Sequence, residues 1–277
     1  MAGVSPVPTV ALLNGAAAEA DPGGLRALAQ VNYGHTTALQ VRALAAQGLD
    51  LHLARLRQGT AELFDAALDE AAVRGWMAQA ARQAGGDCSM RLTVFARDFD
   101  HRSPLREVAL DVLVVATAPQ PPRTQALRVT ACDFLRPVPH LKHVGAFPLF
   151  HHRRQAQLAG HDDALFVEGS GALARIAEGT VWNIGFWNGR TVTWPQAPAL
   201  RGTAERLLQA GLEARGVAQA QRTVTVGELP GFRAAFACNA NGVQPIVAID
   251  AVEYAQAPEL MQLLADAAAL APWEALE

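Results

Sequence analysis

Three prolines within four positions, Pro119, Pro121 and Pro122, divide the chain into two segments. Proline fixes its own backbone angle, lacks an amide donor and keeps the preceding residue out of helical geometry, so a cluster of prolines ends regular structure. We therefore place a domain boundary here, with one domain over 1–118 and another over 124–277. Each segment is long enough to bury its own core, because 51% of the residues are apolar.

Periodicity predicts helices and strands on both sides of this boundary. Apolar residues recur at three- and four-residue spacing over 51–84, and shorter helical patterns cover 147–158 and 203–216. Runs of apolar and β-branched residues predict strands at 90–99, 108–116, 164–167, 180–187, 191–194, 233–238 and 245–249. The sequence thus predicts an α+β fold, with a small N-terminal α/β domain and a larger, strand-rich C-terminal domain.

Charge and cysteine content exclude several classes of protein. The formal net charge is −3 without a basic run, which argues against nucleic acid because phosphate neutralisation needs a clustered basic surface. No apolar stretch is long enough to span a membrane, and the start lacks a secretory signal. Three widely spaced cysteines form neither a disulfide framework nor a metal quartet. We expect a soluble cytoplasmic protein without a metal, and we interpret the His151–Arg154 run as a solvated helix surface.

Lysine usage is unusual, because 22 of the 23 basic residues are arginine and only Lys142 is lysine. Arginine can replace lysine as a surface cation, but not as an amine that must lose its proton and attack a carbonyl. The alternative is that one surface lysine has persisted by chance. The residues around Lys142 bear on this choice.

Five short motifs follow one another along the chain. They are His52–Leu56, Leu141–Ala146, Ala177–Asn183, Leu200–Ala204 and Cys238–Pro245. In this order and spacing the chain resembles the class IV aminotransferases, which are fold-type IV pyridoxal-phosphate enzymes. This family includes branched-chain and D-amino-acid aminotransferases and aminodeoxychorismate lyase. The resemblance extends from about Tyr33 to Pro245 and implies a two-domain fold with pyridoxal 5'-phosphate as cofactor, bound in the C-terminal domain.

The resemblance assigns the chemistry to two residues. Lys142 matches the family's catalytic lysine, whose amine carries the cofactor as a Schiff base and then serves as a base. Glu178 stands in a motif similar to Glu-Gly-Ser/Thr-x-x-Asn, and would keep the pyridine nitrogen protonated. An exposed acid at a strand end is the alternative for Glu178, but its apolar neighbours favour a buried, paired carboxylate.

The resemblance also implies a set of phosphate-binding residues, which are Arg55, Gly202, Thr203, Ala204 and Asn239. A guanidinium suits a phosphate, although an isolated arginine on a helix is otherwise a solvated charge. The Leu200–Ala204 motif precedes a predicted helix, whose free amides and dipole favour an anion. This motif departs from the family, since Thr203 replaces the usual isoleucine and Glu205 the usual arginine. Asn239 stands where threonine is common, and its amide can also donate to phosphate.

Three positions bear on the substrate. Arg97 lies where several relatives keep an arginine for the substrate carboxylate, although a surface charge is an equal alternative. Thr37 ends a Tyr33–Thr37 segment that is short and lacks the family's acid, and a threonine pair here is similar to aminodeoxychorismate lyase. Phe147 stands where branched-chain aminotransferases place a tyrosine against the ring hydroxyl. Phenylalanine cannot make that hydrogen bond, which argues against branched-chain specificity.

We therefore expect an aminotransferase that moves an amino group between an amino acid or amine and a keto acid. The resemblance implies a homodimer with its active sites near the subunit interface. Two alternatives stay open, a lyase of the aminodeoxychorismate type and a protein that binds the cofactor with little catalysis.

Overall fold

The computed structural model describes residues 10–277 and divides into two compact units. The first unit contains 10–121, Leu141–Gly145 and Pro272–Glu277, and the second contains Pro122–His140 and Ala146–Ala271. One division thus falls inside the proline cluster. The grouping differs from the predicted domains in two respects, because the Lys142 segment and Pro272–Glu277 were both expected within the second domain, 124–277. The Lys142 segment groups with the first unit because its main chain pairs with a strand there.

The first unit is built on a seven-stranded sheet with the order β16-β4-β3-β5-β6-β1-β2. Its strands are β1 (Val10–Leu13), β2 (Ala16–Ala17), β3 (Gly34–Arg42), β4 (Ala45–Gln47), β5 (Cys88–Phe95), β6 (Asp111–Thr117) and β16 (Trp273–Ala275). Its helices are η1 (Ala18–Ala20), α1 (Pro22–Val31), α2 (Leu49–Phe64) and α3 (Glu70–Gln83). Every named strand pair in this sheet is antiparallel, and β3, β5 and β6 form its centre.

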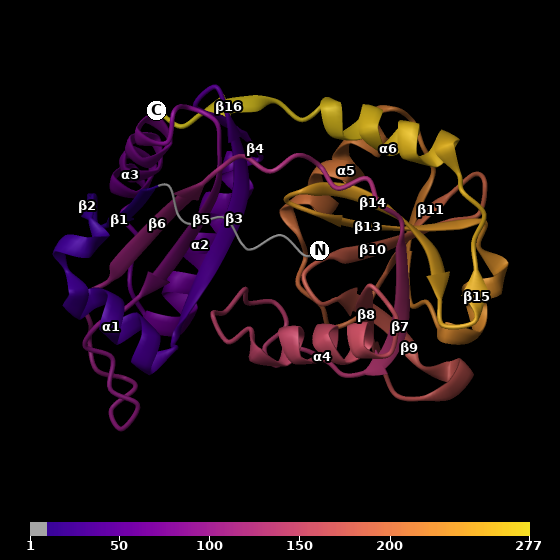
Figure 1. Cartoon of the computed structure of the whole chain (residues 1–277), viewed down its shortest axis with the longest axis horizontal. Coiled ribbons are helices and arrows are strands. Elements are labelled where there is room, and N and C mark those ends of the chain that lie inside the picture. Colours follow the sequence, from indigo (N-terminus) through magenta and orange to yellow (C-terminus); the bar gives the residue numbers. More distant parts are fainter. Residues whose placement is uncertain (1–9) are drawn as a thin grey trace. The chain divides into compact units, whose positions relative to one another are not determined.

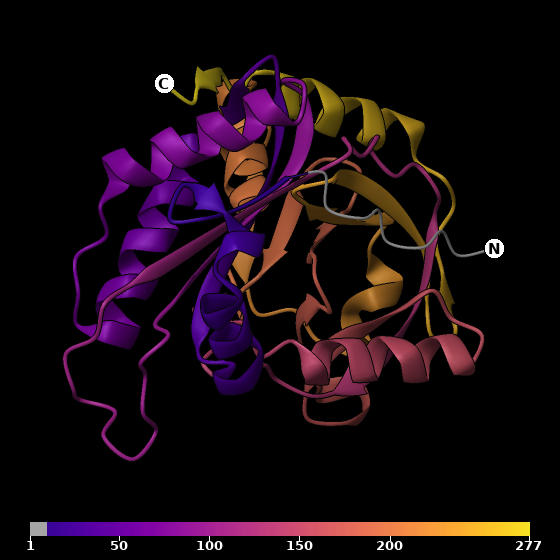
Figure 2. The same ribbon diagram turned by 60° about the vertical axis from the view of Figure 1, so that its left-hand side comes forward.

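Helices α2 and α3 pack against one face of this sheet (Figures 1 and 2). Leu53 and Leu56 of α2 join Met77 of α3 and alternate residues of β3 and β5 in one buried cluster. Burying each such side chain contributes about 1.5–3 kcal/mol, so this face fixes α2 on the sheet. The sequence predicted one helical pattern over 51–84, but the chain turns at Asp65, whose φ is +49°, and α3 starts afresh with Asp69 as its N-cap.

The second unit contains a nine-stranded mixed sheet with the order β12-β11-β10-β13-β14-β7-β8-β9, and β15 pairs with β14. Its strands are β7 (Leu127–Asp133), β8 (Asp163–Glu168), β9 (Arg175–Gly179), β10 (Asn183–Trp187), β11 (Val192–Pro195), β12 (Gln219–Arg222), β13 (Ala234–Asn239), β14 (Gly242–Ile249) and β15 (Val252–Glu253). Its helices are α4 (Phe147–Leu158), η2 (Gly171–Leu173), α5 (Thr203–Ala214), η3 (Val226–Gly231) and α6 (Pro258–Ala269). The predicted α+β class is confirmed.

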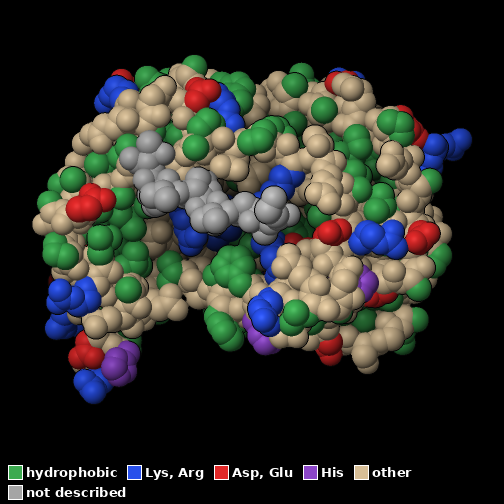
Figure 3. Space-filling model, viewed as in Figure 1, with side chains coloured by type: hydrophobic (Ala, Val, Ile, Leu, Met, Phe, Trp, Pro, Cys, Tyr) green, Lys and Arg blue, Asp and Glu red, His purple; other side chains and the backbone are tan. Residues whose placement is uncertain are grey.

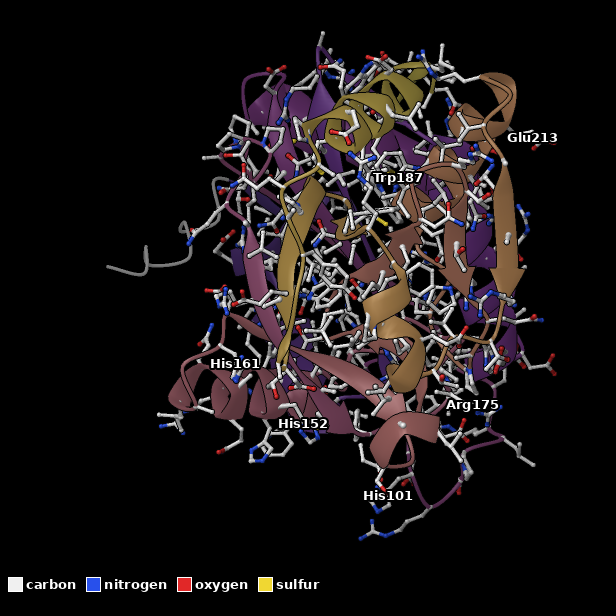
Figure 4. The ribbon with its side chains drawn as sticks, turned by 90° about the vertical axis from the view of Figure 1, so that its right-hand side faces the viewer. His101, His152, His161, Arg175, Trp187 and Glu213 are labelled. Carbon is white, nitrogen blue, oxygen red and sulfur yellow. The ribbon has the colours of Figure 1, made fainter. Side chains whose placement is uncertain are left out.

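Helices α5 and α6 share a buried cluster with β10, β11 and β13. Trp187 of β10, labelled in Figure 4, belongs to this cluster together with Leu260 and Leu264 of α6. The two helices come close at Gly211, where a Cβ atom would lie 2.1 Å from the carbonyl oxygen of Ala267. This packing fixes α5, and with it the helix N-terminus that follows the Leu200–Ala204 motif.

The surface carries charged side chains of both signs, as the formal net charge of −3 implies. Acidic and basic side chains are both scattered over the face drawn in Figure 3. Among residues 10–277, no group of three or more His, Cys, Asp or Glu is placed to hold a metal, and no helix is long and apolar enough to cross a membrane. His152 lies on α4 at the surface of its unit (Figure 4), where Nδ1 is 3.1 Å from Sγ of Cys132.

Candidate active site

The segment that carries Lys142 is attached to the start of β3 by main-chain hydrogen bonds. The amide of Thr36 donates to the carbonyl of Lys142 at 2.8 Å, and the amide of Val144 donates to the carbonyl of Gly34 at 3.0 Å. The first strand residues are also paired with β5, and a Cβ on Gly34 would lie 2.4 Å from the carbonyl oxygen of Val94. The strand therefore holds the peptide of Lys142 in a fixed register.

Arg55 lies on α2, one turn after a buried histidine. His52 Nδ1 is 2.7 Å from the hydroxyl of Thr37 on β3, and both side chains are buried. Burial lowers the pKa of His52 to about 3, and the positive charges of Arg55 and Lys142 contribute in the same direction. The predicted phosphate-binding arginine and the predicted Schiff-base lysine are therefore both within electrostatic reach of the same imidazole.

A second arginine, which the sequence analysis missed, lies near the Lys142 segment. Arg91 on β5 donates from Nε to the hydroxyl of Thr36 at 3.2 Å, and its side chain is exposed on the sheet face opposite α2. Partial burial lowers its pKa. The alternation of the strand could have predicted this position, because Leu92 and Val94 face the core and Arg91 therefore points to the other face of the sheet.

The side chains of both residues predicted to bind substrate already contact other side chains. Arg97 is held by Asp111 through two hydrogen bonds of 2.8 and 2.6 Å, and it pairs with Asp21 at 2.7 Å. Its substrate role stays a prediction, although a substrate would have to compete with two carboxylates. Thr37 is completely buried against α2. The prediction that its side chain binds substrate disagrees with this burial, because alternate residues of β3 face the helix.

Glu178, on β9 of the second unit, is buried and paired, as its apolar neighbours indicated. Arg136 donates from Nε and from a terminal nitrogen to its two carboxylate oxygens at 3.1 and 3.0 Å. This bidentate geometry favours the ionised carboxylate. Arg136 was missed in the sequence, because no spacing rule links it to Glu178.

Side chains connect three of the predicted motifs within the second unit. Asn183 donates to the carbonyl of Leu200 at 2.6 Å, and its Oδ1 lies where a Cβ on Gly202 would approach to 2.2 Å. Asn239 donates to the carbonyl of Val181 at 3.3 Å. The turn after Glu178, the segment before α5 and the end of β13 therefore form one connected group.

The N-terminus of α5 lacks a side-chain cap. Gly202 is the N-cap, and no described side chain caps the first amides of Thr203 and Ala204. A helix end with free N–H groups favours a negatively charged group such as phosphate. These are the donors that the resemblance predicted.

Glu205 lies in the first turn of α5, where its negative charge would oppose the binding of an anion. Its carboxylate accepts a hydrogen bond from Arg201 at 2.6 Å, but within the described chain its Oε2 has no hydrogen-bond partner. Burial raises the pKa of Glu205, while Arg201 and the amide of Gly202 act in the opposite direction. The departure from the family pattern thus places a buried carboxylate, one oxygen of which lacks a partner among the described residues, beside the amides of Thr203 and Ala204.

The family model described as amino-transferase class IV matches residues 34–249 of this chain. The protein belongs to this family. The matched region contains all five motifs and extends over both units of the structure. No curated protein matches the sequence.

Solved aminotransferases and a candidate lyase share the fold. A branched-chain aminotransferase from the thermophilic archaeon Thermoproteus uzoniensis, solved with norvaline, superposes with a TM-score of 0.79 at 17% identity, covering 93% of this chain and 92% of that chain. A hypothetical aminotransferase from Mycobacterium tuberculosis, with α-ketoglutarate and PMP bound, gives 0.74 at 20% identity and covers 87% and 90%. A candidate 4-amino-4-deoxychorismate lyase from Legionella pneumophila gives 0.72 at 17% identity and covers 86% and 91%.

Two of the positions at which this class IV aminotransferase departs from the family motifs are Glu205 and Phe147. Glu205 is buried in the first turn of α5, and Phe147 stands at the first position of α4 with 78% of its surface exposed.

Proposed function

We propose that the protein is a pyridoxal-phosphate-dependent aminotransferase that moves an amino group between an amino acid or amine and a keto acid. The observation that carries this proposal is the position of Lys142. The only lysine of the chain lies on a segment held by β3, and Lys142 and Arg55 are both within electrostatic reach of the buried His52 imidazole. Membership of the class IV family supports the reaction class.

The residues present fit the cofactor. The uncapped amides of Thr203 and Ala204, the Asn239 amide and the Arg55 guanidinium are suitable donors for its phosphate. The ionised, buried carboxylate of Glu178 suits a protonated ring nitrogen. Because Asn183 packs on Gly202, the phosphate donors of α5 and the turn after Glu178 keep a constant arrangement.

Each residue then has a distinct task. When bound, pyridoxal phosphate supplies an aldehyde and an electron-withdrawing ring. Lys142 Nζ holds the cofactor and moves the proton at the substrate Cα. Glu178 holds the ring nitrogen, with Arg136 keeping the carboxylate charged. Arg55 and the α5 amides orient the phosphate, which supplies binding energy without taking part in bond changes.

For the substrate carboxylate we propose Arg91 in preference to Arg97. Arg91 is an exposed residue whose guanidinium lies next to Thr36, and the amide of Thr36 donates to the Lys142 carbonyl. A planar guanidinium can bind a carboxylate through two hydrogen bonds. Arg97 already engages Asp111 in that way and also pairs with Asp21.

A second candidate is a lyase of the aminodeoxychorismate type, favoured by the fold shared with the Legionella protein. The cofactor-binding residues would be the same in both reactions. Release of pyruvate from aminodeoxychorismate without a keto-acid acceptor would establish the lyase and contradict the aminotransferase.

We also propose a homodimer in a reducing compartment such as the cytoplasm. The dimer is supported by family membership and the compartment by three free thiols, of which Cys88 and Cys238 are buried. Sedimentation of the purified protein tests the dimer, and a monomer with full activity would contradict it.

The experiment that tests the function is a visible absorption spectrum, repeated with a panel of L- and D-amino acids and amines. We expect a yellow band that particular donors bleach and that Lys142→Ala lacks. A band that no donor bleaches would contradict the aminotransferase. The absence of a band after incubation with pyridoxal phosphate would contradict the cofactor.

A further inference from the structure

Two histidine–threonine pairs connect β3 with α2. His35 Nε2 is 3.0 Å from the hydroxyl of Thr60, and the hydroxyl of Thr37 is 2.7 Å from His52 Nδ1. All four side chains are buried. Because alternate residues of a strand share a face, His35 and Thr37 reach α2 at two points along the helix.

The main chain of the same strand segment binds the segment that carries Lys142. The carbonyl of Gly34 and the amide of Thr36 bind the main chain on either side of His143, next to Lys142. Four consecutive residues, 34 to 37, therefore hold the lysine segment by their backbone and the arginine helix by their side chains. A shift of α2 against β3 would move Arg55 relative to Lys142.

The two pairs differ in their surroundings. The pKa of His52 is lowered by burial and also by the charges of Arg55 and Lys142. The pKa of His35 is lowered by burial alone, to about 4. The Thr37–His52 pair thus lies within the electrostatic reach of both cations, whereas no charged group contributes to the pKa shift of His35.

Packing limits what the His35–Thr60 pair can do. A Cβ on Gly59 would lie 2.8 Å from the ring of His35, so helix and strand approach closely there. The Nδ1 atom of His35 has no hydrogen-bond partner among the described residues. The His35–Thr60 hydrogen bond therefore contributes to the packing of α2 against β3.

We propose that the Thr37–His52 hydrogen bond is a positioning contact of the cofactor site, which sets Arg55 for the phosphate while β3 holds Lys142. His52 is a positioning residue that acts through Arg55. A neutral imidazole suits this place because a charged one would repel both cations. The inference rests on the proposed function, since it takes the cofactor phosphate as the ligand of Arg55.

The test compares Thr37→Val with Thr60→Val. Each variant removes one buried threonine hydroxyl from one β3–α2 pair and leaves the side-chain shape nearly unchanged, so both should lower the melting temperature of the apoprotein to a similar extent. The probe is pyridoxal phosphate added to apoprotein, with its dissociation constant read from absorbance. We expect Thr37→Val to raise the dissociation constant about tenfold, through the misplaced charge-assisted bond of Arg55, and Thr60→Val to leave it unchanged.

Thr37→Ser keeps the hydroxyl and should restore the unmodified affinity. If Thr37→Val does not fold, His52→Leu removes the same hydrogen bond from the other side and is judged in the same way. Equal dissociation constants for the two valine variants would overturn the inference while the function stands. An unmodified apoprotein that binds no pyridoxal phosphate would overturn the proposed function and the inference together.

Discussion

Arg136 grips both carboxylate oxygens of Glu178, and the two residues are only 5% and 2% exposed. Removing one partner of such a pair leaves a buried charge without compensation. Arg136→Met should therefore destabilise the protein by about 3–5 kcal/mol, measured as the free energy of unfolding in urea. Arg128→Met, which removes an exposed pair with Glu253, is the control and should cost less than about 1 kcal/mol. Similar losses for both variants would contradict a tightly buried pair.

Gly202 should tolerate no side chain while Asn183 is present. An alanine Cβ would meet Asn183 Oδ1 at 2.2 Å, so Gly202→Ala should displace the start of α5 and weaken pyridoxal phosphate binding by about tenfold or more. Asn183→Ala removes the clashing atom. In a double-mutant cycle the two substitutions together should bind the cofactor better than Gly202→Ala alone. Additive losses would contradict the steric coupling.

Glu205 should oppose anions at α5. Burial raises its pKa, so the folded state binds a proton more tightly than the unfolded state. The contribution of Glu205 to the free energy of unfolding is therefore present at low pH, and it is lost as the pH rises above the ordinary glutamate pKa of about 4.5. Glu205→Gln should therefore reduce the decline in unfolding free energy between pH 5 and pH 8, and should tighten inorganic phosphate binding. If the free energy of unfolding of Glu205→Gln falls with pH as steeply as that of the unmodified protein, the raised pKa of Glu205 is contradicted.

His35 and His52 should make the protein sensitive to acid. Burial lowers their pKa values to about 4 and about 3, so below about pH 6.5 the unfolded state binds protons that the folded state does not. Each histidine should cost roughly 2 kcal/mol of unfolding free energy between pH 7 and pH 5. His52→Asn offers a non-titrating side chain with a polar atom near the Nδ1 position, and should halve this dependence. The measurement is urea unfolding across that pH range, and a flat profile for the unmodified protein would contradict buried neutral histidines.

Arg91 and Arg97 can be separated by kinetics. Arg91→Met should raise KM for the amino acid at least about tenfold, because a carboxylate loses a bidentate partner. Arg97→Met should leave KM nearly unchanged and should instead lower stability, since Asp111 is left buried without its guanidinium. The reverse pattern would return the substrate role to Arg97.

Local patterns predicted a large part of the fold. The helix expected over 147–158 is α4, and the helix expected over 203–216 is α5 with its end at Ala214. The expected strand at 180–187 begins only at Asn183, because Gly179 and Trp182 close a turn through a 2.8 Å hydrogen bond. Strand β7 was not predicted, since most of its side chains are only partly buried and lack a clear alternation.

The site was harder to predict where contacts join distant segments. Periodicity shows which face of β3 is buried, but not that Thr37 meets His52, and it says nothing of Arg136 beside Glu178. These partners are 15 and 42 residues apart. Such pairs are decided by how elements pack, which one sequence without an alignment does not display.

The assignment of Leu141–Gly145 and Pro272–Glu277 to the first unit has a consequence for synthesis. The sheet of that unit gains β16, at the very end of the chain, as the neighbour of β4. A growing chain that stops at Pro121 exposes the backbone edge of β4 and the free side of β3 at Gly34, and open edges invite pairing with other chains. The N-terminal half is thus made first and completed last, so a gene cut at the proline cluster should yield an aggregating fragment.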